Sequence, residues 1–88
     1  MRKNITIVNK LGLHARAAAK LVTLASEFEC DIQLARAGRQ VNAKSIMGVM
    51  MLAAGKGTSL ELIATGTDEV DAVDRLEKLV QERFGEGE

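Results

Sequence analysis

Hydrophobic and polar positions change their period along the chain, and the changes mark the predicted elements. Three segments alternate apolar and polar side chains, which is typical of strands with one buried face: residues 4–8, 31–36 and 60–65. The apolar positions of this alternation are Ile5, Ile7, Ile32, Leu34, Leu60, Leu62 and Ala64. The pair Ala37-Gly38 can turn the chain into a partner strand over residues 40–43, so the pattern predicts a hairpin and four strands.

Two other segments before the last strand have the pattern of helices. In residues 15–28 the apolar side chains lie at the spacing of one helical face, at Ala18, Leu21, Val22, Ala25 and Phe28. The pattern over residues 45–52 predicts a short helix with Ser45 as its N-cap. We expect Gly55 or Gly57 to end this helix.

The longest helical pattern follows the last strand. After Gly66, Thr67 is expected to cap this helix, and Asp68 and Glu69 in its first turn interact favourably with the helix dipole. Its predicted inner face consists of Val70, Val73, Leu76, Val80 and Phe84. Residues 85–88 are polar, and we expect them to be frayed.

The predicted order of elements is therefore β-α-β-β-α-β-α. Three helical faces and four half-apolar strands favour an α+β fold of two layers, an open-faced β-sandwich with the helices on one side of the sheet. A chain of 88 residues has room for one hydrophobic core, so residues 1–88 are expected to form a single domain. The pattern by itself leaves the arrangement of the strands open.

Composition counts against several function classes. Lysine plus arginine and aspartate plus glutamate each number 12, so the formal net charge is zero, and the chain has no Trp or Tyr. A nucleic-acid-binding surface needs basic side chains and, for single strands, aromatic rings. The single Cys30 provides no disulfide framework and indicates a small buried hydrophobe. With one His and one Cys we expect no metal ion, and with no long apolar run we expect a cytoplasmic protein that does not enter a membrane.

The candidate chemistry lies at His14, the one histidine of the chain, where the first helical pattern begins. A helix N-terminus carries unpartnered backbone N–H groups and about half a positive charge. The amides of Ala15, Arg16 and Ala17 would hold an anion attached to the ring, and the guanidinium of Arg16 would bind it as a planar fork. The arrangement predicts a site that takes up a phosphoryl group on His14 and passes it on.

Two sequence blocks carry a family resemblance. The first is Asn-Lys-Leu-Gly-Leu-His-Ala-Arg over residues 9–16, and the second is Asn-Ala-Lys-Ser-Ile-Met-Gly-Val-Met over residues 42–50. Together with the length and the order of elements, they resemble HPr, the histidine-containing phosphocarrier family of the bacterial phosphoenolpyruvate-dependent phosphotransferase system. One position departs from the pattern, because the family usually has Pro after the site arginine and this chain has Ala17. Since Pro is tolerated in a first helical turn, we expect the change to tune the chemistry without abolishing it.

The resemblance implies an antiparallel sheet in the strand order 1-4-2-3. It also implies that His14 is phosphorylated at Nδ1, that phosphorylated enzyme I is the donor, and that enzyme IIA components are the acceptors, in sugar uptake, regulation or both. The chain would then be a carrier and not an enzyme, and we expect it to act as a monomer without a cofactor.

The second block leads to two further predictions. Ser45 is a good N-cap, and the resemblance implies that it is also a target of the bifunctional kinase/phosphorylase that acts on many relatives. The short helix after it is rich in methionine, and its apolar side chains cannot all face inward. Flexible thioethers suit a surface that docks several partners in turn, so we predict that Ile46, Met47 and Met50 dock enzyme I and enzyme IIA components.

Three alternative functions stay open from the sequence. The same chemistry serves a nitrogen-related regulatory branch, which the sequence does not separate from sugar uptake. A non-catalytic regulatory or RNA-binding α/β sandwich has the same pattern of elements, although zero net charge and the lack of strand aromatics count against RNA. An acyl-phosphate hydrolase on a similar fold would turn over its substrate without a lasting phosphoenzyme.

Overall fold

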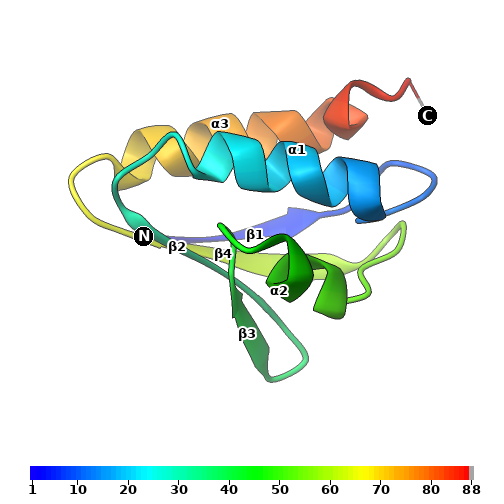
Figure 1. The fold of residues 1–88 in the computed structure, drawn as a ribbon, viewed down its shortest axis with the longest axis horizontal. Helices are drawn as coiled ribbons and strands as arrows, with labels where there is room; N and C mark the ends of the chain where they lie inside the picture. Colours follow the sequence, from blue (N-terminus) through cyan, green and yellow to red (C-terminus); the bar gives the residue numbers. More distant parts are fainter. Residues whose placement is uncertain (88) are drawn as a thin grey trace.

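The computed structural model describes residues 1–87 as a four-stranded sheet with helices on one face (Figure 1). The elements are β1 (Arg2–Thr6), α1 (Ala15–Ala25), β2 (Asp31–Arg36), β3 (Arg39–Asn42), α2 (Ile46–Met51), β4 (Ser59–Thr65), α3 (Glu69–Gln81) and the 3₁₀ helix η1 (Arg83–Gly85). The strands lie in the order β1-β4-β2-β3, and every neighbouring pair is antiparallel. The predicted fold class, element order and strand order are confirmed, and η1 is an addition to the expected elements.

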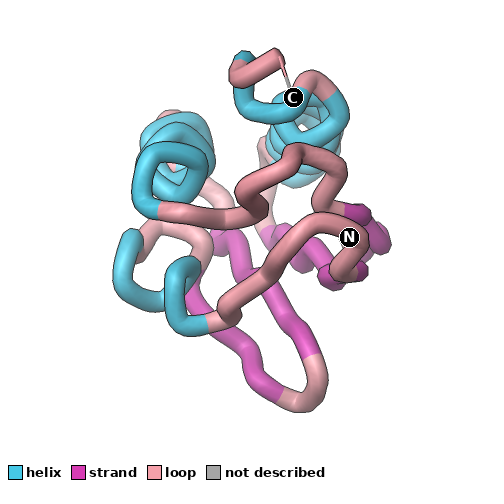
Figure 2. Tube along the Cα trace, turned by 90° about the vertical axis from the view of Figure 1, so that its right-hand side faces the viewer, coloured by secondary structure: helices cyan, strands magenta, loops and turns pink. Residues whose placement is uncertain are grey.

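The alternating apolar residues of the strands meet on the inner face of the sheet. Ile32 lies opposite Ala64, and Leu34 lies opposite Leu62, across the β2–β4 pair. All four are buried under α1 and α3, while the other face of the sheet is left uncovered by helices (Figure 2). Burial of one large aliphatic side chain contributes about 1.5–3 kcal/mol, so this face supplies much of the driving force for folding. The predicted inward positions are confirmed.

The hairpin and the boundaries of β1 and β3 differ only slightly from expectation. Ala37 and Gly38 both have positive φ, 50° and 82°, which is the backbone of the tight turns that join antiparallel strands. The third strand is Arg39–Asn42, one residue earlier than predicted. The first strand ends at Thr6 because the backbone of Ile7 bonds to the loop before β4 instead of to the ladder, although its side chain is buried as predicted.

Two helices end earlier than the apolar pattern indicates. Helix α1 ends at Ala25, and Phe28 lies in the turn that follows, where its N–H donates to the Ala25 carbonyl at 3.2 Å and its ring is still buried. Helix α2 ends at Met51, because Ala53 takes a left-handed conformation with φ of 50°. The prediction that Gly55 or Gly57 ends this helix is therefore wrong.

The start of α3 also differs from the prediction. Its N-cap is Asp68 and not Thr67, and the Asp68 carboxylate accepts the backbone N–H groups of Glu29 at 2.9 Å and Cys30 at 3.0 Å. These two bonds tie the start of α3 to the segment before β2. The prediction that Val70 lies on the inner face is wrong, because its side chain is 66% exposed. Ala72 is buried in its place.

The C-terminal segment is ordered as far as it is described. Phe84 is buried as predicted but lies beyond α3, in η1, where it and Arg83 have left-handed φ values of 54° and 55°. These two residues turn the chain back toward the start of α1, and Glu86 lies against the loop before that helix (Figure 1). The expectation of a frayed tail is wrong for Glu86, and the part of it that concerns Glu88 lies outside the described residues.

Cys30 is free and buried, as the composition indicated. Burial raises the pKa of its thiol to about 11, and the nearby Asp68 carboxylate adds to the shift, so the thiol is protonated at neutral pH. None of the helices described in residues 1–87 is long and apolar enough to cross a membrane.

Candidate functional site

The loop before α1 is fixed by a close backbone contact. Gly12 has φ of 68°, and a Cβ atom at this position would lie 2.5 Å from the carbonyl oxygen of Ala54. The next residue, Leu13, is buried and its N–H donates to the same carbonyl at 2.8 Å. Only glycine fits here, because both the conformation and the space exclude a side chain. The contact holds the loop against the segment after α2 and so fixes where His14 begins the helix.

His14 is the N-cap residue of α1. Its backbone is extended, with φ of −70° and ψ of 176°, and its carbonyl accepts the N–H of Ala18 at 2.8 Å. The His14 side chain makes no capping hydrogen bond. The next three amides, on Ala15, Arg16 and Ala17, have no intrahelical acceptor in an α-helix. The side chain of the N-cap therefore leaves the positive end of the helix uncovered.

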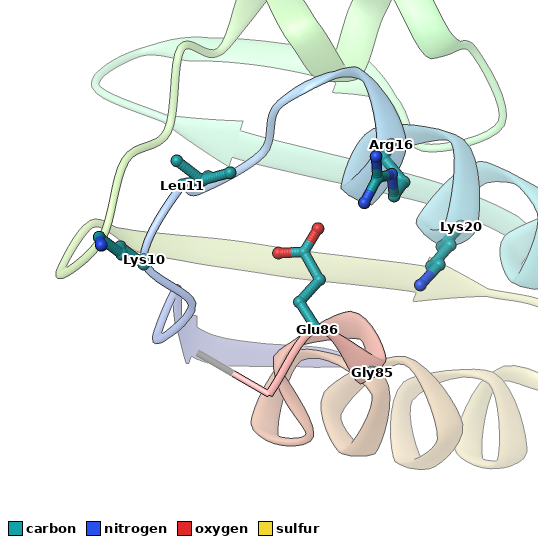
Figure 3. Close-up of a pocket in the computed structure, with 6 residues that line it drawn as sticks. All are labelled: Lys10, Leu11, Arg16, Lys20, Gly85 and Glu86. Atoms are coloured by element: carbon teal, nitrogen blue, oxygen red, sulfur yellow. The ribbon is translucent and has the colours of Figure 1, made fainter.

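Arg16 lies beside this end of the helix and lines an open pocket of about 340 Å³ (Figure 3). The other lining residues are Lys10, Leu11, Lys20, Gly85 and Glu86. Within residues 1–87 the Arg16 side chain is exposed and makes no hydrogen bond or ion pair, so its guanidinium can take up an anion. Lys20 lies one turn further along α1, and its ammonium donates to the Phe84 carbonyl at 2.6 Å.

The imidazole of His14 has a carboxylate neighbour that the sequence did not reveal. Its Nε2 atom lies 2.5 Å from Oε2 of Glu86, and Oε1 of the same carboxylate accepts Nδ2 of Asn9 at 3.0 Å. The His14 side chain is 27% exposed, against 12% for Glu86, so the ring is partly accessible to solvent. Asn9 is fully buried, and its Nδ2 also donates to the Gly12 carbonyl at 2.9 Å.

The charge state of Glu86 follows from these partners. Partial burial by itself raises the pKa of this carboxyl, but the hydrogen bonds from Asn9 and His14 and the charges of His14 and Lys20 outweigh it. The pKa of Glu86 is lowered as a result, so the group is an ionised carboxylate at neutral pH.

Helix α2 lies beside α1 (Figure 2). Unlike α1, it begins with an N-cap side chain that binds a backbone amide of its own helix. The Oγ atom of Ser45 accepts the Gly48 N–H at 3.2 Å, which confirms the prediction that Ser45 is the N-cap. Ile46, Met47 and Met50 are 44%, 75% and 42% exposed. We refer to these three side chains, with the exposed Leu11 and Met51, as the α2 patch.

The structure thus brings His14, the first amides of α1 and Arg16 to one end of the molecule, with α2 beside them. It adds Glu86 and Asn9, neither of which the sequence analysis had assigned to the site. One signal for Glu86 was present in the chain: an apolar Phe84 two residues before it can anchor a tail that otherwise looks polar. Asn9 belongs to the first sequence block, but the pattern assigned it no role, because a polar residue in a loop is ordinarily solvated.

Comparison with known proteins agrees with this geometry. A family profile described as the PTS HPr component phosphorylation site matches residues 1–82. The phosphocarrier protein HPr of Cupriavidus necator is 57% identical over 88 residues, which cover 100% of this chain and 99% of that protein.

Solved structures give the same result. Crystalline HPr from Thermoanaerobacter tengcongensis superimposes with a TM-score of 0.94 at 44% identity, covering 98% of this chain and 97% of that one. A structure described as an HPr dimer from the same organism has a TM-score of 0.80 at 46% identity, with coverage of 93% and 94%. The sequence, the fold and these relatives together show that the chain belongs to the HPr family, the phosphocarrier proteins, rather than enzymes, of the phosphotransferase system.

Proposed function

We propose that this chain accepts a phosphoryl group on Nδ1 of His14 from phosphorylated enzyme I and donates it to enzyme IIA components. The observation that carries the proposal is the uncovered N-terminus of α1, where His14 is the N-cap and its side chain makes no capping bond. The amides of Ala15, Arg16 and Ala17 and the Arg16 guanidinium supply positive charge where the phosphoryl oxygens would lie.

An open site suits a carrier because the group must leave as readily as it arrives. Phosphoryl transfer depends chiefly on alignment and on stabilisation of charge, so the chain needs few groups of its own. The partly exposed ring of His14 lets donor and acceptor proteins reach it in turn. The same relay serves sugar uptake, regulation or both, and the nitrogen-related branch is the alternative output of the same chemistry.

The α2 patch is the docking surface in this proposal. Ile46, Met47 and Met50 are exposed on α2, and the segment after this helix contacts the loop before His14. Apolar thioether side chains can adapt to several partners. Exposed apolar side chains gathered on one short helix are more typical of a protein contact than of an isolated surface. We expect the chain to present this face as a cytoplasmic monomer, although the HPr of T. tengcongensis is described as a dimer in one structure. Sedimentation at working concentration tests this expectation.

Ser45 is the proposed point of regulation. Its hydroxyl caps α2 next to the α2 patch, so a phosphoryl group added there by an HPr kinase/phosphorylase would place negative charge at the docking surface. The cap geometry itself tolerates an acidic group, because a negative charge at a helix N-terminus is favoured by the dipole.

Incubation with phosphoenolpyruvate and enzyme I tests the proposal. We expect a mass increase of one phosphoryl group per chain, and we expect it to be lost in acid, because phosphohistidine is acid-labile whereas phosphoserine is not. A label that survives acid, or that persists in His14→Ala, would contradict the proposal. Adding purified enzyme IIA domains then tests whether the label moves on.

A further inference from the structure

We propose that Glu86 is a positioning residue for His14, whose carboxylate accepts the imidazole Nε2–H and so directs the Nδ1 lone pair toward the phosphoryl donor. The proposal rests on the function proposed above and assigns it a residue outside the two sequence blocks. Its basis is the 2.5 Å contact between Nε2 and Oε2. Figure 3 shows the Glu86 side chain pointing from the C-terminal segment toward the loop and the first turn of α1.

The contact fixes the tautomer of the ring. An ionised carboxylate has only acceptor oxygens, so an unprotonated Nε2 would set two lone pairs against each other at this distance. Nε2 therefore carries the proton, and in the neutral ring Nδ1 carries the lone pair. The lowered pKa of Glu86 agrees with an ionised partner over the pH range in which a carrier works. The same logic, with a carboxylate holding one ring nitrogen while the other does the chemistry, operates in the catalytic triads of hydrolases.

Asn9 holds the carboxylate in place. Its Nδ2 group donates to both the Gly12 carbonyl and Oε1 of Glu86, so it joins the loop before His14 to the C-terminal segment. The amide orientation is unambiguous because both neighbours are acceptors. Its Oδ1 atom is buried without a partner within residues 1–87. A buried, unpaired acceptor disfavours folding, which is a reason to expect that the amide serves the site.

The backbone that carries Glu86 is anchored as well. The ring of Phe84 is 1% exposed, and its carbonyl accepts the ammonium of Lys20 on α1. The left-handed conformations of Arg83 and Phe84 are unfavourable for side chains other than glycine, so the packing of Phe84 has to maintain them. The position of the carboxylate is thus set by a packed aromatic ring and by Asn9.

The negative charge of Glu86 also stabilises the positive charge that the reaction creates on the His14 ring. When Nδ1 attacks the phosphorus of the phosphohistidine donor, a new P–N bond forms and the donor P–N bond breaks, with its electron pair returning to the donor ring. The His14 ring keeps its Nε2 proton and becomes a phosphoimidazolium, so its positive charge develops against the Glu86 carboxylate. On transfer to an acceptor the electron pair returns to Nδ1 and the ring is neutral again. No proton has to leave Nε2 in either direction.

Nitrogen NMR of the unphosphorylated chain, labelled with ¹⁵N in histidine, tests the tautomer directly. In the wild type with a neutral ring, we expect one tautomer, with the proton on Nε2 and a slowly exchanging Nε2–H signal. In Glu86→Ala we expect that signal to be lost to solvent exchange and the Nδ1–H tautomer to be present. The matched control is Glu82→Gln, which removes an exposed carboxylate from the same segment. A Glu86→Ala spectrum like that of the wild type would overturn the proposal.

Transfer kinetics test the role of the charge. In Glu86→Gln, which keeps the size of the side chain, we expect the rate constant for uptake from enzyme I to fall about tenfold, because a charge-assisted hydrogen bond is replaced by a neutral one. Glu82→Gln should transfer at the wild-type rate. A Glu86→Gln chain that takes up the group as fast as the wild type, or faster, would overturn the positioning role. If the wild type itself takes up no phosphoryl group, the proposed function fails, while the tautomer measurement still decides what Glu86 does to the ring.

Discussion

Helices α1 and α2 pack side by side, yet their N-termini are completed in opposite ways. At α2 the hydroxyl of Ser45 accepts the Gly48 N–H, so the N-cap side chain satisfies one of the free amides of its own helix. At α1 the ring of His14 makes no such bond and turns instead to Glu86. The start of α2 is therefore closed by its own N-cap residue, whereas the start of α1 is left open for an external anion.

The difference shows that one residue at the N-cap decides what a helix start can do. Both starts have the same unpartnered amides and the same dipole. A short hydroxyl folds back on these amides, whereas an imidazole engaged on its Nε2 side leaves them open and keeps Nδ1 available. The comparison suggests substitutions that convert one start into the other.

The largest effect is expected for His14→Ser, which gives α1 the cap of α2. Phosphoryl uptake from enzyme I should be abolished, while the helix should still form, because Ser is a better N-cap than His. Intact mass after incubation with phosphoenolpyruvate and enzyme I measures the first result, and far-ultraviolet circular dichroism measures the second. Acid-labile phosphate on this variant would show that another group accepts it.

Arg16→Ala should slow transfer without changing the fold. The side chain is exposed and has no hydrogen bond or ion pair within residues 1–87, so its loss leaves no group unpaired. Removing one charge-assisted partner of the phosphoryl group should cost about 1.5–3 kcal/mol in the transfer step. Rapid-quench kinetics with enzyme I checks this. The transfer rate of Arg16→Lys, which keeps the charge but loses the planar fork, should lie between those of the wild type and Arg16→Ala. Wild-type rates in Arg16→Ala would remove this residue from the site.

Ser45→Asp tests whether the closed start of α2 belongs to the docking surface. The acidic side chain is also a good N-cap, so the melting temperature should be unchanged, but its charge beside Ile46 and Met47 should slow uptake about tenfold or more. Ser45→Ala is the matched control, with about 1 kcal/mol of stability lost and normal transfer. Equal transfer by Ser45→Asp and the wild type would leave Ser45 as a helix cap alone.

Helix α3 provides a third kind of start, and its stability should depend on pH. Hydrogen bonds lower the pKa of Asp68 below its ordinary value of 3.8. The largest effect comes from the backbone N–H of Glu29, and hydrogen bonds with Cys30 add to it. Because the folded pKa is the lower one, Asp68 stabilises the fold above that ordinary value, and its contribution is lost as pH falls toward the folded pKa. Urea unfolding of Asp68→Asn should show lower stability at neutral pH and a smaller loss in acid than the wild type. Parallel pH profiles for the two chains would contradict this role.

The smallest effect is expected for Ala17→Pro, which restores the residue usual in the family. Ala17 is the third residue of α1, where the backbone N–H has no intrahelical acceptor, so proline removes no hydrogen bond of the helix. Thermal melting and transfer should both stay close to the wild type. Loss of the fold would mean that the buried site at Ala17 cannot accommodate the proline ring. Loss of transfer would assign the Ala17 amide a direct part in binding the phosphoryl group.

Much of this fold follows from local pattern. Strand alternation placed Ile32 and Leu34 in the core, and the spacing around Leu21 predicted α1, because such patterns depend only on neighbours two to four residues apart. The Ser45 cap was predictable for the same reason. The errors cluster where distant segments intervene, as at Asp68, whose carboxylate holds a segment 38 and 39 residues away instead of its own helix.

The sequence by itself determined the identity of the candidate site: one histidine, followed two residues later by an arginine, at the start of an amphipathic helix. Tertiary structure alone decided what surrounds the ring. Glu86 is 72 residues from His14, and it reaches Nε2 only because Phe84 packs into the core and turns the chain back. No local period encodes such a contact, since it depends on how α1 and α3 pack side by side on the sheet. The chain thus specifies its nucleophile locally, and the fold supplies the carboxylate beside it.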